Sequence, residues 1–139
     1  MTIAPTMLIE LRRRARDVAA RAYAPYSGFP VGAAVLAADG AIHAAANVEN
    51  ASFGLSICAE RAAIFQAVAH GARRIDAVVI YTPTAVATTP CGACRQVIQE
   101  FGPEALIVSC TDDEHAERSF TLPALLPDAF GPGSVAGSR

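Results

Sequence analysis

The sequence predicts an α/β domain in which a mixed five-stranded sheet lies between helices, giving three layers, α/β/α. Apolar residues recur at helical spacing near the N-terminus, and apolar runs then alternate with helical segments. The eight residues 111–118 between the last two predicted strands are too few for a parallel crossover, so we expect the fifth strand to run antiparallel to the fourth. With 139 residues, 53% of them hydrophobic, the chain suits a single globular domain.

The first predicted element is a helix over residues 7–23, with Thr6 as its N-cap and Pro25 at its end. Asp39-Gly40 is typical of a hairpin turn and lies between the first two strands. The predicted strands cover residues 31–37, 42–47, 75–81, 105–110 and 119–122. Further helices are expected from Ser56, as N-cap, to Gly71, from Cys91 to about Phe101, and as a single turn over residues 122–126.

The ends of the chain suggest how far the domain extends. We expect one domain over residues 1–130, and a mobile tail over residues 131–139, which are rich in Gly and Ser. No apolar run reaches the length of a membrane span and no export signal is visible, so we expect a cytoplasmic protein that does not associate with membranes. The net charge of -2 argues against nucleic acid as a partner.

Two short cysteine motifs carry the chemistry, Cys58-Ala59-Glu60-Arg61 and Pro90-Cys91-Gly92-Ala93-Cys94-Arg95. Catalytic zinc takes three protein ligands and keeps one position open, whereas structural zinc usually takes four. We therefore expect Cys58, Cys91 and Cys94 to bind one Zn2+ ion as cofactor, with water in the fourth position. If each motif starts a helix, the free N–H groups and the helix dipole stabilise the thiolates.

The acidic residue between the ligands predicts proton transfer. Glu60 lies two residues from Cys58, where it can reach the water on the zinc ion and act as general base and then as general acid. Three thiolates on a divalent ion leave a net negative charge, which a hydrogen-bonding cation would offset. We expect Arg61 to be this cation, with Arg95 as a second candidate.

These motifs resemble those of the zinc deaminases, whose signature is His-x-Glu or Cys-x-Glu followed by Pro-Cys-x-x-Cys. The sequence is similar to cytidine deaminases of the small, homotetrameric kind with an all-cysteine metal site, over nearly the whole chain. The further segments that carry this resemblance are residues 25–27, 29–34, 47–51 and 125–127. It implies a cytidine-deaminase-like fold, a homotetramer, and hydrolysis of cytidine and 2′-deoxycytidine to uridine and 2′-deoxyuridine with release of ammonia, as in pyrimidine salvage.

The resemblance also implies a set of substrate-binding residues. Phe29 would stack on the pyrimidine ring, and the backbone of Ala59 and Cys91 would contact the base. Asn47 and Glu49, two residues apart in an extended segment, point the same way and would hold a sugar hydroxyl. Phe130 would close over the active site of a neighbouring subunit. This chain has Phe53 where family members often have Tyr.

Two alternatives stay open at this point. The first is deamination of another cytosine-bearing compound, such as a blasticidin-like nucleoside antibiotic, which the Asn47/Glu49 pair argues against. The second is a non-catalytic zinc-stabilised module, which needs a fourth protein ligand. Cys110 would be the best candidate for that ligand, although it ends an apolar run and is otherwise expected to be a buried structural thiol.

Overall fold

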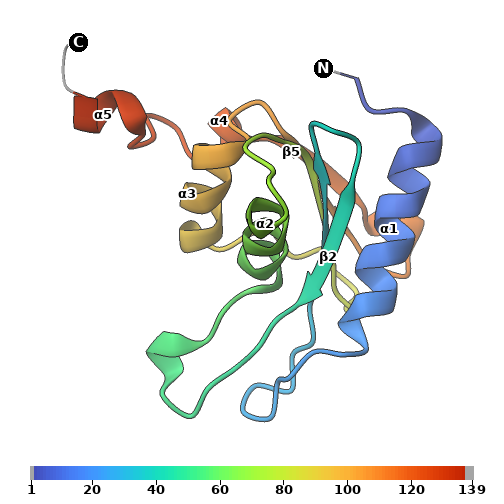
Figure 1. The fold of residues 1–139 in the computed structure, drawn as a ribbon. Helices are drawn as coiled ribbons and strands as arrows, with labels where there is room; N and C mark the ends of the chain where they lie inside the picture. The colour runs from blue at the N-terminus through green and yellow to red at the C-terminus, as the bar shows by residue number, and fades with distance from the viewer. Residues whose placement is uncertain (1, 137–139) are drawn as a thin grey trace.

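The computed structural model describes residues 2–136 and shows a five-stranded sheet in the order β2-β1-β3-β4-β5 (Figure 1). The strands are β1 (Gly32–Ala37), β2 (Ile42–Ala46), β3 (Ile75–Tyr81), β4 (Leu106–Cys110) and β5 (Arg118–Thr121). The helices are α1 (Pro5–Ala19), α2 (Ala59–Ala69), α3 (Gly92–Phe101), α4 (Leu122–Leu125) and α5 (Pro132–Ala136). Two 3-10 turns, η1 (Phe53–Leu55) and η2 (Glu114–Ala116), lie in connecting segments.

The strand directions confirm the predicted mixed sheet. β3 and β4 are parallel, whereas β1 pairs antiparallel with both β2 and β3. β5 runs antiparallel to β4, as the short connection requires, and η2 lies within that connection. As a result, the carboxyl ends of β2, β3 and β4 share one edge of the sheet.

The two faces of the sheet carry different helices. Figure 1 shows α1 on one side and α2 with α3 on the other. Val78 belongs to the core beneath α2 and α3, whereas its neighbour Val79 belongs to the core beneath α1. Successive strand side chains point to opposite faces, so the apolar run of β3 is explained by burial on both sides. The predicted three-layer α/β/α arrangement is therefore confirmed.

Helix α1 approaches β1 closely at Gly32. A Cβ atom at this position would lie 1.9 Å from the carbonyl oxygen of Ala15, so only glycine allows the contact. Gly32 pairs with Ala46 on one side and Tyr81 on the other. The close approach thus anchors α1 at the sheet edge where β2 and β3 end.

The predicted boundaries of the first helix are wrong at both ends. α1 begins at Pro5 with Ala4 as N-cap, because proline is well accommodated in the first helical turn, and Thr6 does not cap it. The helix ends at Ala19 rather than at Tyr23. The Tyr23 N–H donates to the Asn47 carbonyl oxygen (3.0 Å), and this long-range pairing draws the chain out of the helix.

The N-cap of α2 also differs from the prediction. Ser56 does not cap this helix, because its hydroxyl oxygen accepts the backbone N–H of Asn50 (3.1 Å). Cys58 occupies the N-cap position instead. The backbone of Val48 pairs with that of Ile57 (3.0 and 2.9 Å), which fixes the end of the loop before Cys58.

The C-terminal segment crosses the end of α3 and then forms α5, which extends away from the sheet (Figure 1). Residues 132–136 of the expected tail are thus helical, residues 137–139 lie outside the described part, and the mobility of the tail stays a prediction. Among residues 2–136, no helix is long and apolar enough to cross a membrane.

Candidate metal centre and adjoining cavity

Two helix N-termini meet at the proposed metal site. Cys91 is the N-cap of α3, where the sequence predicts a helix start, and Cys58 is the N-cap of α2 in place of the expected Ser56. Cys94 lies in the first turn of α3, and its backbone N–H donates to the sulfur of Cys91 (3.4 Å). Free N–H groups and the helix dipole at these ends favour negatively charged sulfur.

The three sulfur atoms form a compact donor set. The Sγ atoms of Cys58, Cys91 and Cys94 all lie within 4.8 Å of one another, and those of Cys58 and Cys91 are 3.6 Å apart. This is the only group of three or more potential metal-ligating side chains found within residues 2–136. Thiolates are strong zinc ligands, and three of them leave one coordination position open. The residues present therefore fit a catalytic rather than a structural zinc ion.

A hydrogen bond and a nearby cation favour the thiolate form of Cys58. The hydrogen bond from Cys94 is the main cause that lowers the pKa of Cys58 to about 5, and the guanidinium of Arg61 adds to it. The same interaction with Cys58 raises the pKa of Cys94, because one thiol donates to the other sulfur. Nη2 of Arg61 lies 3.5 Å from Cys58 Sγ, whereas its Nε is buried without a hydrogen-bond partner in the described chain. Arg61 therefore lies where a thiolate-neutralising cation is required.

The carboxyl group of Glu60 lies beside this cluster. Glu60 lies in the first turn of α2 and is only 4% exposed. Burial raises the pKa of Glu60 to about 7, and the negative charge of Cys58 adds to the shift. Glu60 is therefore a buried, ionisable group next to the sulfurs.

A cavity of about 300 Å3 opens beside the sulfurs. It brings together seven of the predicted site residues, from four separate segments: Phe29, Asn47, Glu49, Cys58, Ala59, Glu60 and Cys91. Residues that the sequence analysis did not single out complete the lining: Ser27, Val31, Ile80, Thr88 and Thr89. The Thr88-Thr89 pair directly precedes Pro90-Cys91, and this polar pair next to a metal motif was the signal available in the sequence.

Asn47 and Glu49 also shape the loop that carries Phe29. The side chain of Asn47 accepts the backbone N–H of Val31 (2.9 Å) and donates to the carbonyl oxygen of Phe29 (2.9 Å). The Glu49 carboxylate accepts the backbone N–H groups of Tyr26 (3.0 Å) and Ser27 (3.1 Å) and also the Ser27 hydroxyl. The hydrogen bond from Ser27 is the main cause that lowers the pKa of Glu49.

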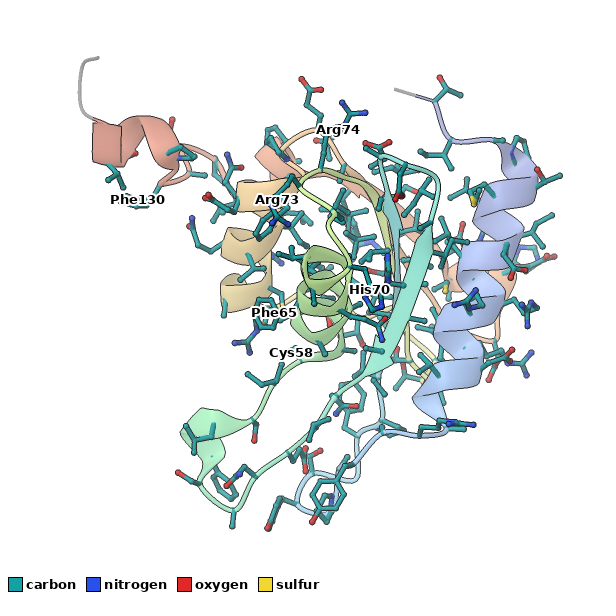
Figure 2. All side chains as sticks on the ribbon, viewed as in Figure 1. Cys58, Phe65, His70, Arg73, Arg74 and Phe130 are labelled. Atoms are coloured by element: carbon teal, nitrogen blue, oxygen red, sulfur yellow. The ribbon has the colours of Figure 1, made fainter. Side chains whose placement is uncertain are left out.

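Phe130 and Arg95 do not contribute to the site within their own chain. Phe130 does not border the cavity; its residue is 61% exposed, and Figure 2 shows it well away from Cys58. Arg95 donates to the carbonyl oxygens of Pro90 (2.8 Å) and Leu125 (2.8 Å) and to the Thr89 hydroxyl (3.3 Å). None of these hydrogen bonds reaches a cysteine sulfur.

A hollow with an aromatic wall adjoins the cavity. Phe53 and Tyr26 pack edge to face, with ring centroids 5.7 Å apart, and with Ser56 they border about 300 Å3. Ser27 and Glu49 border both spaces, so the hollow continues from the cavity. Phe53 is exposed in the isolated chain.

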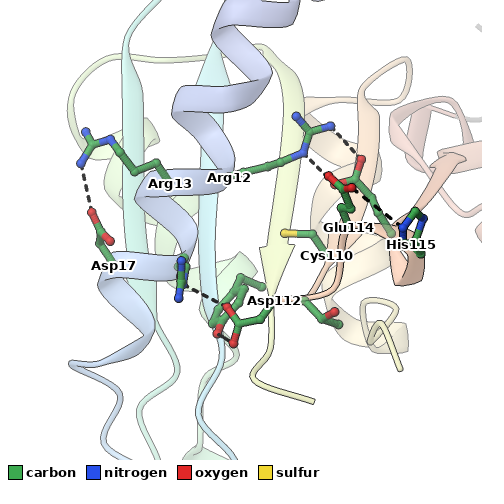
Figure 3. Close-up of a pocket in the computed structure, with 11 residues that line it drawn as sticks. Arg12, Arg13, Asp17, Cys110, Asp112, Glu114 and His115 are labelled. Carbon is green, nitrogen blue, oxygen red and sulfur yellow. Dashed lines mark hydrogen bonds and ion pairs between the residues drawn. The ribbon is translucent and has the colours of Figure 1, made fainter. Parts of the chain in front are cut away.

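A larger cavity, of about 630 Å3, lies on the other face of the sheet between α1 and the β4–β5 segment (Figure 3). Its charged side chains are paired with one another: Arg12 with Glu117 (2.7 Å) and Arg16 with Asp112 (3.0 Å). Cys110 borders this cavity and packs in the core beneath α1. It therefore lies across the sheet from α2 and α3 and is not a fourth ligand in the sulfur cluster.

A five-stranded α/β/α domain with cysteines at two helix N-termini and a buried glutamate between them is typical of zinc-dependent deaminases. Residues 6–110 match the family described as the cytidine and deoxycytidylate deaminase zinc-binding region. A cytidine deaminase from Sporosarcina psychrophila is 44% identical over 123 residues, covering 88% of each chain. One from Mycobacterium tuberculosis is 43% identical over 121 residues, covering 87% of each chain.

Solved structures agree with these similarities. The crystal structure of cytidine deaminase from Burkholderia pseudomallei is 43% identical, covers 88% of this chain and 98% of that chain, and has a TM-score of 0.83. That from Mycobacterium tuberculosis is 42% identical, covers 89% and 97%, and has a TM-score of 0.75. The chain belongs to the cytidine and deoxycytidylate deaminase family, and the predicted class of zinc-dependent enzyme is confirmed.

Proposed function

We propose that this protein catalyses hydrolytic deamination of cytidine and 2′-deoxycytidine to uridine and 2′-deoxyuridine, releasing ammonia. The observation that carries the proposal is one cavity that combines three parts of the required chemistry. It is bordered by the metal-binding residues Cys58 and Cys91, by Glu60, and by the Asn47/Glu49 pair with Phe29.

Cys58, Cys91 and Cys94 would hold the zinc ion, and Arg61 would offset their excess negative charge. When bound, zinc supplies a water molecule activated for attack on carbon C4 of the cytosine ring. Glu60 moves both protons of that water. It delivers one to ring atom N3 and the other to the departing amino group, so that ammonia leaves and a carbonyl remains at C4.

The polar side of the cavity has the donors and acceptors needed for one sugar hydroxyl. Of the roughly four acceptor positions of a carboxylate, Glu49 uses three for Tyr26 and Ser27, which leaves one on Oε2. The Asn47 amide has one N–H free besides its bond to Phe29. A hydroxyl that donates to Glu49 and accepts from Asn47 would satisfy both groups.

The apolar side of the cavity suits a flat ring. Phe29 is 38% exposed and borders the cavity, where it can stack on the pyrimidine. The backbone of Ala59 and Cys91, at the two helix N-termini, would contact the polar edge of the base. This combination of a ring-sized apolar wall and a hydroxyl-binding pair favours an ordinary nucleoside over a blasticidin-like antibiotic.

An ultraviolet assay tests the proposal directly. The zinc-loaded protein should consume cytidine and 2′-deoxycytidine with release of ammonia, lose activity when a chelator removes zinc, and regain it when zinc is restored. Free cytosine should be a far poorer substrate, because it forms none of the hydrogen bonds that Asn47 and Glu49 offer to a sugar hydroxyl. Turnover of a blasticidin-like compound but not of cytidine would support the alternative, and a zinc-loaded protein inactive on all of them would overturn the proposal.

We further propose a homotetramer in which Phe130 completes the pocket of a neighbouring subunit. The exposure of Phe53, Phe65 and Phe130 supports it, because a monomer rarely leaves so many large aromatic side chains uncovered. Closed symmetry of the D2 type is common for four identical chains. Light scattering should give roughly four times the chain mass, and a monomeric mass would reject the assembly.

We also propose a cytoplasmic location. All four cysteines are free thiols, which accords with a compartment where thiols stay reduced.

A further inference from the structure

Two consecutive side chains of α3 bind the C-terminal segment. Arg95 Nη1 donates to the carbonyl oxygen of Leu125 at the end of α4 (2.8 Å), and Gln96 Nε2 donates to the carbonyl oxygen of Phe130 (2.8 Å). Both acceptors are backbone atoms, so the bonds fix the path of the chain and leave the Phe130 ring free. The two bonds bracket the short stretch that leads from α4 to Phe130.

This stretch has little else to hold it. Over residues 127–130, the Gln96–Phe130 bond is the only hydrogen bond to the body of the domain within the described chain. Asp128 has φ of 51°, in the left-handed region, which aspartate adopts more readily than most residues other than glycine. The chain therefore turns at Asp128, between the two points that the side chains on α3 hold.

The same two residues follow directly after the metal ligands. Arg95 Nε also donates to the carbonyl oxygen of Pro90, next to Cys91, and Arg95 is adjacent to Cys94. One guanidinium group thus ties the turn before α3 to the end of α4. Arg95 therefore fixes the turn that precedes Cys91 and the start of the C-terminal segment relative to each other.

We propose that Arg95 and Gln96 form a clamp that sets the position of Phe130 relative to the metal-bearing helix. They are positioning residues, since neither borders the cavity. The inference rests on the proposed function, in that the effect on activity follows from Phe130 closing a neighbouring pocket. The effect on the order of the segment does not depend on it.

The substitution Gln96→Glu tests the clamp with little change in shape. A carboxylate cannot donate to the Phe130 carbonyl oxygen, so the hydrogen-bonded amides at the two ends of this stretch, those of Leu126 and Gly131, should exchange with deuterium faster than in the parent. Zinc content and tetramer mass should stay the same. KM for cytidine should rise roughly 2- to 10-fold, the range expected for one lost neutral hydrogen bond, with little change in kcat.

Gln99→Glu is the matched control on the same helix. The Gln99 amide lies beside Gly131 (3.8 Å from the position of a Cβ there) but makes no hydrogen bond among those of the described residues. The control introduces the same charge near the same segment and should leave both exchange and KM unchanged. Unchanged exchange in Gln96→Glu, or equal acceleration in both variants, would overturn the clamp.

The double variant with Phe130→Ala separates this inference from the shared-pocket proposal. If the clamp acts through Phe130, adding Gln96→Glu should cause no further rise in KM. If the rises in KM of the two single variants multiply in the double variant, the clamp is contradicted. If Phe130→Ala alone leaves KM unchanged, the shared pocket fails, while the exchange measurement still decides the clamp.

Discussion

The side-chain amide of Asn47 donates a hydrogen bond of 2.9 Å to the carbonyl oxygen of Phe29. The proposed sugar-binding residue therefore also holds the residue proposed to stack on the base. The same side chain accepts the N–H of Val31, so the conformation of the chain from Phe29 to Val31 depends on one amide group. Because Asn47 has both roles, its substitution should affect the binding of the base as well as that of the sugar.

Asn47→Ala should impair cytidine and a sugarless cytosine analogue alike, because it releases the Phe29 loop as well as the sugar. Glu49→Gln should be selective. The glutamine oxygen can still accept the N–H groups of Tyr26 and Ser27, and its amide can donate to the Ser27 hydroxyl, but the charged acceptor for the sugar hydroxyl is lost. Its kcat/KM for cytidine should fall about 10- to 100-fold, as expected for a hydrogen bond to a charged group, and far less for the analogue. Steady-state kinetics on both substrates check this. An Asn47→Ala protein that keeps full activity on the analogue would contradict the double role.

Replacing Cys58, Cys91 or Cys94 with Ala should remove zinc and activity together, because two thiolates cannot hold the ion in place. The matched control is Cys110→Ala, which lies across the sheet and should retain about one zinc per chain. Metal analysis of the purified variants decides the assignment. Loss of zinc in the Cys110 variant alone would show that the sulfur cluster is not the binding site.

Glu60→Gln should retain zinc and the fold but lose most turnover, by at least the roughly 10²–10⁴-fold typical of a general acid–base group. The amide is similar in shape and cannot carry the protons. Zinc content, melting temperature and kcat should be measured on the same sample. Near-normal kcat in the zinc-loaded variant would rule out Glu60 as the proton carrier.

Cys110 should be inert to alkylation in the native protein. Burial raises the pKa of its thiol from 9.0 to about 11, so at pH 8 only on the order of 0.1% would be thiolate. Because the folded-state pKa lies above the unfolded value, Cys110 should stabilise the fold fully below about pH 9, and this contribution should be lost as the pH rises through about 11. Mass spectrometry after iodoacetamide treatment should find Cys110 modified only after unfolding. Rapid labelling at pH 8 without unfolding would contradict its burial.

Mixed tetramers test the shared pocket. Phe130→Ala and Glu60→Gln chains, dissociated and reassembled in equal amounts, should recover activity above the mean of the two parents. If each pocket takes Glu60 from one chain and Phe130 from a neighbour, about a quarter of the pockets contain both intact residues. If Phe130 serves its own chain, no such pocket exists, and the mixture should show dilution alone.

The sequence by itself determined the parts of this protein that depend on local patterns. The apolar run at 75–81 identified the central strand, the short connection after residue 110 indicated the direction of β5, and the second cysteine motif placed Cys91 at a helix start. Each of these follows from rules that act within a few residues, namely side-chain periodicity, chain reach and the polarity of helix ends.

The tertiary structure alone decided features that depend on groups far apart in the chain. Pairing of Tyr23 with Asn47 ended α1 early, and Arg95, adjacent to a ligand, turned out to bind Leu125. The cavity similarly draws Ser27 and Thr88 to positions beside Glu60. No local signal specifies such contacts, because a hydrogen bond between distant segments forms only where the packing of the whole domain brings its donor and acceptor together.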